Sequence, residues 1–213
     1  FFIIDLNIIF LITILRKFKN CKLYMNDYSQ IYVVGDIHGC AQALERLLAV
    51  VELTSQDTIV FLGDYVDRGP NSKRVMEIMI ELNEQFHVIP LLGNHEIMML
   101  DAAKESVMRD LWRLQFGGQQ TLESYGGDLA NIPTEHLDFM RQCLPFYETD
   151  DHLFVHANYL PGSPLVDQEA QIRYCSGLRG GGSANSARHH QPDWAGSAHI
   201  TALRIFHFCR EMY

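Results

Sequence analysis

The chain has 213 residues, which is enough for one domain with a substantial hydrophobic core. It is 47% hydrophobic and 20% charged, and its formal net charge of -9 argues against nucleic acid or an anionic membrane as the main partner. The 5 cysteines are scattered and form no C-x-x-C pair. This pattern fits the reduced thiols of a cytoplasmic protein and argues against a disulfide framework or a zinc finger.

Residues 1–24 differ from the rest of the chain. An apolar run over residues 1–15 is followed by four basic residues: Arg16, Lys17, Lys19 and Lys22. The run is shorter than the ~20 residues that cross a bilayer, and its positive charges follow it, whereas those of a secretory signal come first. Because Met25 stands just ahead of the first expected strand, we expect residues 1–24 to lie outside the native domain. A peripheral membrane anchor and an ordinary structural segment are the alternatives.

From residue 31 the sequence alternates between short apolar runs and helical periodicity. Apolar runs at 31–34, 57–62 and 86–92 predict three buried strands. A first helix is expected over residues 41–51, and Pro70 opens a second one, since proline is favoured in the first turn of a helix. This order predicts a βαβαβ unit, and therefore a parallel sheet with right-handed crossovers.

The second half of the chain has a weaker pattern. We expect a helix over 97–116, a loop-rich segment around the glycine pairs 117–118 and 126–127, a helix over 134–143 and a strand over 153–155. After Asp167 no period of either kind is clear, apart from a weak element over 201–209.

Three polar motifs lie directly after the three predicted strands: GDIHG at 35–39, GDYVDRG at 63–69 and GNHE at 93–96. Ligands of open α/β sheets bind at the carboxyl ends of the strands. Aspartate, histidine and asparagine offer oxygen and nitrogen donors that suit borderline divalent or trivalent metal ions. A fourth strand delivers His156 in the same way. The sequence therefore predicts a metal site at this edge of the sheet.

These motifs resemble those of the phosphoprotein phosphatase family, within the calcineurin-like metallophosphoesterases. The resemblance covers residues 31–156 and includes the pattern over 112–127 that bacterial and phage members share. It implies a metallophosphoesterase-type α/β sandwich built on βαβαβ units, the second half of which we expect to be incomplete. It also implies a serine/threonine protein phosphatase that acts on a phosphorylated protein or peptide.

The resemblance further implies a centre with two metal ions. Asp36 and His38 would bind the first ion, Asp64 would bridge both, and Asn94 and His156 would bind the second. We expect Mn²⁺, with iron or zinc as alternatives. Two such ions lower the pKa of a bridging water and clamp the phosphoryl oxygens during in-line attack.

The remaining catalytic roles fall to three residues of the second and third motifs. His95 is the expected general acid for the leaving group, and Asp67 would orient it and favour its protonated form. Arg68 offers a planar fork to the phosphate oxygens, with a structural ion pair as the alternative. The other histidines of the first 155 residues have no matching context, so we expect them on the surface: His87, His136 and His152.

The sequence departs from the family pattern near its end. No Gly-His pair follows Asp167 to complete the second metal site, and no clear copy of the later phosphate-binding arginine is present. Arg173 and Arg179 lie near the place expected for this arginine. Candidates for the missing histidine are His189, His190, His199 and His207, although none of them follows an expected buried strand. We therefore divide the chain into an extension (1–24), a metallophosphoesterase domain (25–167) and an atypical tail (168–213). The tail is either out of the native reading frame, which we favour, or a genuine divergent segment.

Two residues bear on the substrate. Family members that cleave diadenosine polyphosphates tend to carry alanine at the position of Asp67 and aspartate at the position of Glu96, so this chain resembles the protein-phosphatase branch more closely. A diadenosine polyphosphate hydrolase is the alternative enzyme. An inactive phosphoprotein-binding pseudoenzyme is the alternative outside catalysis, because the last metal-ligand histidine is missing.

Overall fold

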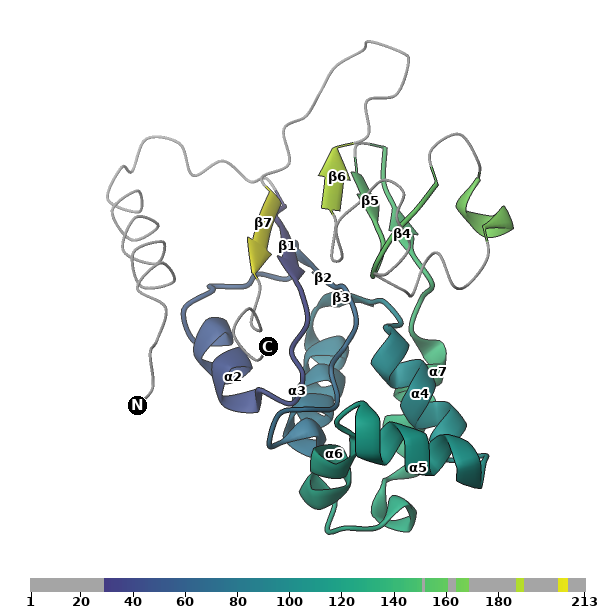
Figure 1. The fold of residues 1–213 in the computed structure, drawn as a ribbon. Helices are drawn as coiled ribbons and strands as arrows, with labels where there is room; N and C mark the ends of the chain where they lie inside the picture. The colour runs from purple at the N-terminus through teal and green to yellow at the C-terminus, as the bar shows by residue number, and fades with distance from the viewer. Residues whose placement is uncertain (1–28, 151, 161–163, 169–186, 190–202, 207–213) are drawn as a thin grey trace.

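The computed structural model describes residues 29–150, 152–160, 164–168, 187–189 and 203–206, the last two ranges by their backbone alone. The fold is mixed α/β, as the sequence predicts, with two sheets and a group of helices (Figure 1). The first sheet is parallel, has the order β3-β2-β1-β7 and consists of β1 (Ile31–Val34), β2 (Thr58–Phe61), β3 (His87–Pro90) and β7 (Leu203–Phe206). The second is antiparallel, has the order β4-β5-β6 and consists of β4 (Tyr147–Glu148), β5 (His152–Phe154) and β6 (Ala187–His189).

Alternate residues of the first sheet face two different hydrophobic clusters. In β1, Tyr32 and Val34 pack toward the helices, whereas Val33 packs toward the second sheet. Phe154 of β5 reaches the same inter-sheet cluster, in which Val33 and Phe154 are fully buried. The period of two therefore puts the first sheet in the middle of the domain, with helices on one face and the second sheet on the other.

The helices are α2 (Ala41–Leu48), α3 (Ser72–Gln85), α4 (Asn94–Ala102), α5 (Ser106–Gln115), α6 (Gly118–Ser124) and α7 (Thr134–Gln142). Two short 3₁₀ turns follow, at Leu129–Asn131 and Leu165–Asp167. In Figure 1 helices α4 to α7, in teal and green, lie together beneath the two sheets. None of the helices in the described ranges is long and apolar enough to cross a membrane.

Several predicted boundaries in the first half were wrong by a few residues. Helix α2 ends at Leu48 and not at residue 51, and β2 and β3 are shorter than the apolar runs that predicted them. Helix α3 begins at Ser72, two residues after Pro70, because the side chain of Asn71 accepts a hydrogen bond from the Arg74 N–H and caps the helix there.

Two predictions about the helical region gave the wrong secondary structure and not only the wrong boundaries. The expected helix over 97–116 is two helices, because the chain turns after Ala102 and α5 folds back against α4 without a glycine or proline to mark the turn. The glycine-rich segment after it contains α6. Gly117, at a φ of 86°, precedes this helix, and Gly127 donates to the carbonyl of Leu122 at its end. The glycines therefore bracket a short helix, as they do at many helix ends.

Two histidines expected on the surface are buried. His136 is hydrogen-bonded through Nδ1 to the hydroxyl of Tyr125 at 2.8 Å, and His152 stacks on Phe154 with 5.9 Å between the ring centroids. His87 is exposed, as expected. An isolated histidine in an amphipathic segment carries no sequence pattern that distinguishes a core position from a surface one.

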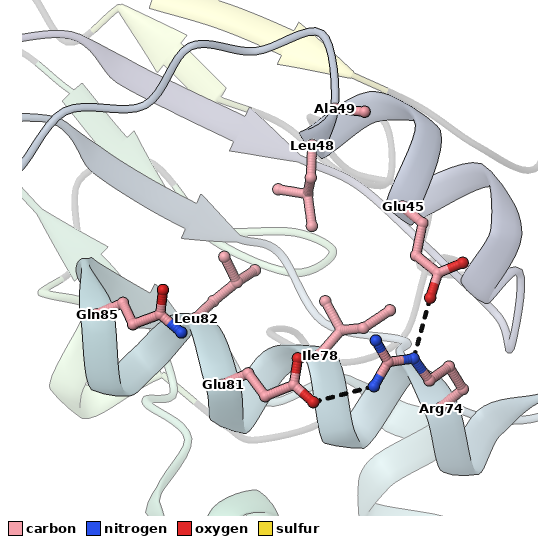
Figure 2. A pocket seen from close by; sticks show the side chains of 8 residues that line it. All are labelled: Glu45, Leu48, Ala49, Arg74, Ile78, Glu81, Leu82 and Gln85. Atoms are coloured by element: carbon pink, nitrogen blue, oxygen red, sulfur yellow. Dashed lines mark hydrogen bonds and ion pairs between the residues drawn. The ribbon is translucent and has the colours of Figure 1, made fainter.

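A shallow groove separates α2 from α3 (Figure 2). Arg74 of α3 lies across it, 2.9 Å from the carboxylate of Glu45 on α2 and 3.0 Å from that of Glu81. Apolar side chains of Leu48 and Ile78 flank this ion-pair network. The network is largely exposed, so it contributes little to stability and serves to connect two helices that cover the same face of the sheet.

Candidate active site

The loops after β1 and β2 are joined by their backbones at the carboxyl edge of the first sheet. The amides of Ile37 and His38 both donate to the carbonyl of Asp64 at 2.9 Å. His38 and Asp64 have positive φ values of 44° and 57°, in the left-handed region that side chains other than glycine seldom adopt. Strained backbone of this kind persists where the surroundings hold it in place, and it clusters at functional sites.

The carboxylate of Asp64 is the centre of the predicted metal site. One of its oxygens lies 3.7 Å from Nε2 of His38, and the other lies 3.4 Å from Nε2 of His156. Asp36 faces His38 at 3.9 Å, and Asn94 Oδ1 lies 2.9 Å from His156 Nε2. The structure thus brings together all five predicted ligands, with Asp64 between the two sides. Their roles as ligands stay a prediction.

Both candidate histidine ligands are oriented by backbone carbonyls. Nδ1 of His38 lies 2.9 Å from the carbonyl of Val66, and Nδ1 of His156 lies 2.8 Å from that of Leu62. A carbonyl only accepts, so each Nδ1 carries a proton, and Nε2 of His38, which makes no hydrogen bond within the described ranges, presents a lone pair toward Asp64. Nε2 of His156 lies within hydrogen-bond distance of the amide oxygen of Asn94. Burial also lowers the pKa of His38, although the charge of Asp64 opposes this, so the neutral form is favoured. A metal ligand requires this form.

Two buried atoms at the site test whether a metal ion fits. Within the described ranges, Oδ1 of Asp36 and Nε2 of His38 make no hydrogen bond. An unsatisfied buried polar atom costs about 1–3 kcal/mol, so native proteins seldom leave two side by side. Groups that could hold a metal ion gather around Asp64, one with Asp36 and His156 and one with His38 and His95. The residues therefore fit divalent metal ions, although nothing in the donor set selects one element.

His95 itself is held by other partners. Its Nδ1 lies 2.8 Å from Oδ2 of Asp67, and its Nε2 lies 3.1 Å from the guanidinium of Arg68. Arginine only donates, so Nε2 accepts from Arg68 and Nδ1 donates to Asp67. With both nitrogens engaged, His95 matches the predicted proton donor better than a metal ligand.

The environment of His95 also favours its protonated form. Burial alone would lower its pKa, but the hydrogen bond to Asp67 and the charges of Asp64 and Asp67 outweigh burial, so the pKa of His95 is raised above its usual value. A proton on Nε2 would face the donor groups of Arg68. Protonated His95 therefore requires the guanidinium of Arg68 to move away, for example onto the oxygens of a phosphate.

Sequence reasoning missed the residues that hold Asp67. This aspartate is fully buried, and its carboxylate accepts from the indole N–H of Trp112 and from the hydroxyl of Thr121, both at 2.8 Å. Both residues lie within the family pattern over 112–127, which was recognised without any indication of what its polar side chains do.

The structural role of Glu96 was missed as well. Its fully buried carboxylate accepts from the backbone N–H groups of Gly93 at 3.0 Å, Asp64 at 2.8 Å and Tyr65 at 2.7 Å. Burial and the nearby charge of Asp64 raise the pKa of Glu96 to about 7. Glu96 thus joins the second motif to the third. No space remains beside this contact, since a Cβ on Gly93 would overlap the carboxylates of Asp64 and Glu96.

The substitutes proposed for the late family residues cannot be placed. Arg173, Arg179, His190, His199 and His207 lie outside the described residues, and His189 belongs to β6, where only the backbone is described.

Two packed sheets with oxygen and nitrogen donors at the strand ends match the architecture of a metallophosphoesterase. The chain belongs to the calcineurin-like phosphoesterase family, whose model matches residues 29–200. This finding confirms the predicted superfamily and fold class.

Curated relatives and a solved structure each resemble part of this chain. A symmetrical bis(5'-nucleosyl)-tetraphosphatase of Acidovorax ebreus is 50% identical over 74 residues, which are 34% of this chain and 26% of the relative. Another of the same name, from Nitrosomonas europaea, is 32% identical over 144 residues, which are 66% of this chain and 48% of the relative. The chain thus spans between about a quarter and a half of these relatives. A solved protein provisionally described as a diadenosine tetraphosphatase shares 26% identity at a TM-score of 0.48, over 68% of this chain and 63% of the other.

Proposed function

We propose that the chain hydrolyses a phosphoric ester or anhydride bond at the site around Asp64. One observation carries the proposal: the two oxygens of Asp64 face the Nε2 atoms of His38 and His156, and the His95–Asp67 pair lies beside them. Groups that bind metal ions and a group that donates a proton are the two components that such a hydrolysis needs.

The residues divide the work as follows. Asp36, His38, Asp64, Asn94 and His156 would hold two divalent cations, which lower the pKa of a water and neutralise charge on the phosphoryl group when bound. Arg68 leaves His95 to bind the phosphate oxygens. His95, oriented by Asp67, then gives the proton on Nε2 to the departing oxygen.

Dinucleoside tetraphosphates are the first substrate class to test. Support comes from the curated relatives, which bear the name of symmetrical bis(5'-nucleosyl)-tetraphosphatases. The matches of 50% and 49% identity extend over only 74 residues, 34% of this chain, so they support the shared family more strongly than the substrate. This reading replaces the protein phosphatase as the leading substrate hypothesis.

A phosphorylated serine or threonine is the second class, and a specific observation favours it. The leaving group of a phosphoserine is an alkoxide, which needs a proton far more than the nucleoside diphosphate that leaves when a dinucleoside tetraphosphate is cleaved symmetrically. A buried aspartate that orients His95 and raises its pKa is suited to such a poor leaving group. Asp67 and Glu96 also resemble the protein-phosphatase branch.

A direct comparison of kcat/KM on diadenosine tetraphosphate and on a phosphoserine peptide, with Mn²⁺ present, tests both classes. We expect diadenosine tetraphosphate to be cleaved symmetrically and with the higher kcat/KM. The opposite ranking would establish the phosphoprotein reading. Absence of hydrolysis on both, and on an aryl phosphate, with metal bound would contradict the proposed function and leave a phosphate-binding protein.

A further inference from the structure

The carboxylate of Asp67 is surrounded by hydrogen-bond donors from three directions. Oδ2 accepts from His95 Nδ1 and from Trp112 Nε1, both at 2.8 Å, and Oδ1 accepts from Thr121 Oγ1 at 2.8 Å. All of these side chains are buried. In such an environment the orientation of a carboxylate is fixed by its donors, because no water competes for its lone pairs.

The direction of the hydroxyl hydrogen bonds follows from the number of protons available. Thr121 has one hydroxyl proton, and Asp67 Oδ1 only accepts, so this proton points at Asp67. The contact of 2.9 Å between Ser72 Oγ and Thr121 Oγ1 must then use the proton of Ser72. The backbone N–H of Asp67 donates to the same two hydroxyls, at 2.9 Å to Thr121 and 3.1 Å to Ser72. Thr121 thus binds both the main chain and the side chain of Asp67.

The backbone of Asp67 depends on these contacts. Asp67 and Arg68 have φ values of 73° and 66°, which are strained for residues with a Cβ. The amide of Arg68 donates to the carbonyl of Gly117 at 3.0 Å, where α6 begins. A strained turn needs an outside support, and here Ser72 of α3, Thr121 of α6 and the carbonyl of Gly117 provide it.

Trp112 is placed for this hydrogen bond and not only for packing. It is the one buried residue of α5, whose other side chains are half-buried or exposed. Its ring lies against Gly118 so closely that a Cβ there would overlap the indole. The ring is therefore locked in one orientation, with its N–H directed at the oxygen of Asp67 that also holds His95.

We propose that Trp112 and Thr121 are positioning residues, which hold Asp67 and through it His95 in the orientation needed to donate a proton to the leaving group. Within the described ranges, the side-chain hydrogen bonds of both residues go to Asp67 and Ser72, and none goes to a predicted metal ligand. The inference rests on the proposed function for its kinetic consequence, but the orientation of His95 can be observed without catalysis.

The kinetic test uses Trp112→Phe, which keeps the ring and removes the N–H, and Thr121→Val, which keeps the shape and removes the hydroxyl. Substrates are phenyl phosphate and 4-nitrophenyl phosphate, whose leaving groups differ in their need for a proton. We expect kcat on phenyl phosphate to fall about tenfold in each variant, as for partners that orient a catalytic ligand, with a smaller loss on 4-nitrophenyl phosphate. KM and metal content should not change, and Thr121→Ser should restore the rate.

Two controls separate positioning from packing. Tyr125→Phe removes a buried hydroxyl at the end of the same α6 helix, where it pairs with His136 and not with Asp67, so the ratio of the two rates should stay as in the wild type. In the His95→Asn variant, adding Trp112→Phe should not change the ratio of the rate on phenyl phosphate to the rate on 4-nitrophenyl phosphate. The proposal would be overturned if Trp112→Phe and Thr121→Val lowered kcat equally on both substrates. It would also be overturned if Trp112→Phe lowered kcat as much in the His95→Asn variant as in the wild type.

A spectroscopic readout decides the matter even if no substrate is hydrolysed. In protein with ¹⁵N-labelled histidine, the Nδ1 proton of His95 should give a downfield resonance that is absent from His95→Asn. Trp112→Phe and Thr121→Val should shift or broaden it, whereas Tyr125→Phe should not. A resonance unchanged by both substitutions would show that Trp112 and Thr121 do not position His95.

Discussion

The metal side and the acid side of the site are built by different means. The candidate metal ligands follow strand ends, and backbone hydrogen bonds from neighbouring loops hold them in place. His95 lies in the first turn of α4, and its orientation depends on Asp67 and on side chains from α5 and α6. Binding of metal ions should therefore withstand changes in the helices, whereas proton donation should respond to them.

The largest effect is expected from the metal side. Asp64→Asn removes the charge shared by both groups of candidate ligands, so metal content should fall and hydrolysis should drop to background. Metal analysis of the purified variant beside its rate checks this. Asp110→Asn, at an exposed aspartate, is the matched control and should change neither. Retention of full metal content by Asp64→Asn would show that the ligands lie elsewhere.

The second-largest effect on the rate is expected when the proton donor is removed. His95→Asn should lower kcat by about 10²–10⁴-fold on a substrate with a poor leaving group, and much less on 4-nitrophenyl phosphate. Metal content should stay near that of the wild type, since His95 is bound to Asp67 and Arg68 and not assigned to a metal. The control is His87→Asn on the surface. Equal losses on both substrates would remove His95 from this role.

Glu96 connects the two sides, and its replacement should affect stability first. Glu96→Gln puts an amide N–H group among four backbone N–H donors, so we expect a loss of about 1–3 kcal/mol in the free energy of unfolding. Urea denaturation measures it, with the exposed Glu84→Gln as the control. A stability equal to the wild type would mean that these hydrogen bonds do not hold the motifs together.

The smallest effect concerns a group remote from the site. Burial lowers the pKa of His136 below its usual 6.5, despite the carboxylates of Glu77 and Glu135. The unfolded chain then takes up this proton more readily than the folded one, so stability should decrease as the pH falls below 6.5. His136→Gln should make the free energy of unfolding less dependent on pH between about 5 and 7. The same slope in both proteins would contradict the expected titration.

The sequence predicted three strands of the first sheet, and the edge at which the candidate ligands meet, for a physical reason. Apolar runs that end in glycine and a polar residue specify both the strand and the edge at which Asp36, Asp64 and Asn94 lie. The helical region was harder. Nothing in the composition of 97–116 marks the turn after Ala102, and α6 is too short for a period of 3.6 to stand out. The roles of Trp112, Thr121 and Glu96 arise from contacts between segments far apart in the chain, which no local pattern encodes.

The most direct test of the account is a metal titration of chelated protein. After treatment with EDTA and dialysis, hydrolysis of an aryl phosphate is measured as Mn²⁺ is added, together with the bound metal. The account predicts no activity at the start, and a rise that levels off when two metal ions are bound per chain. Full activity in the chelated, metal-free protein would contradict it.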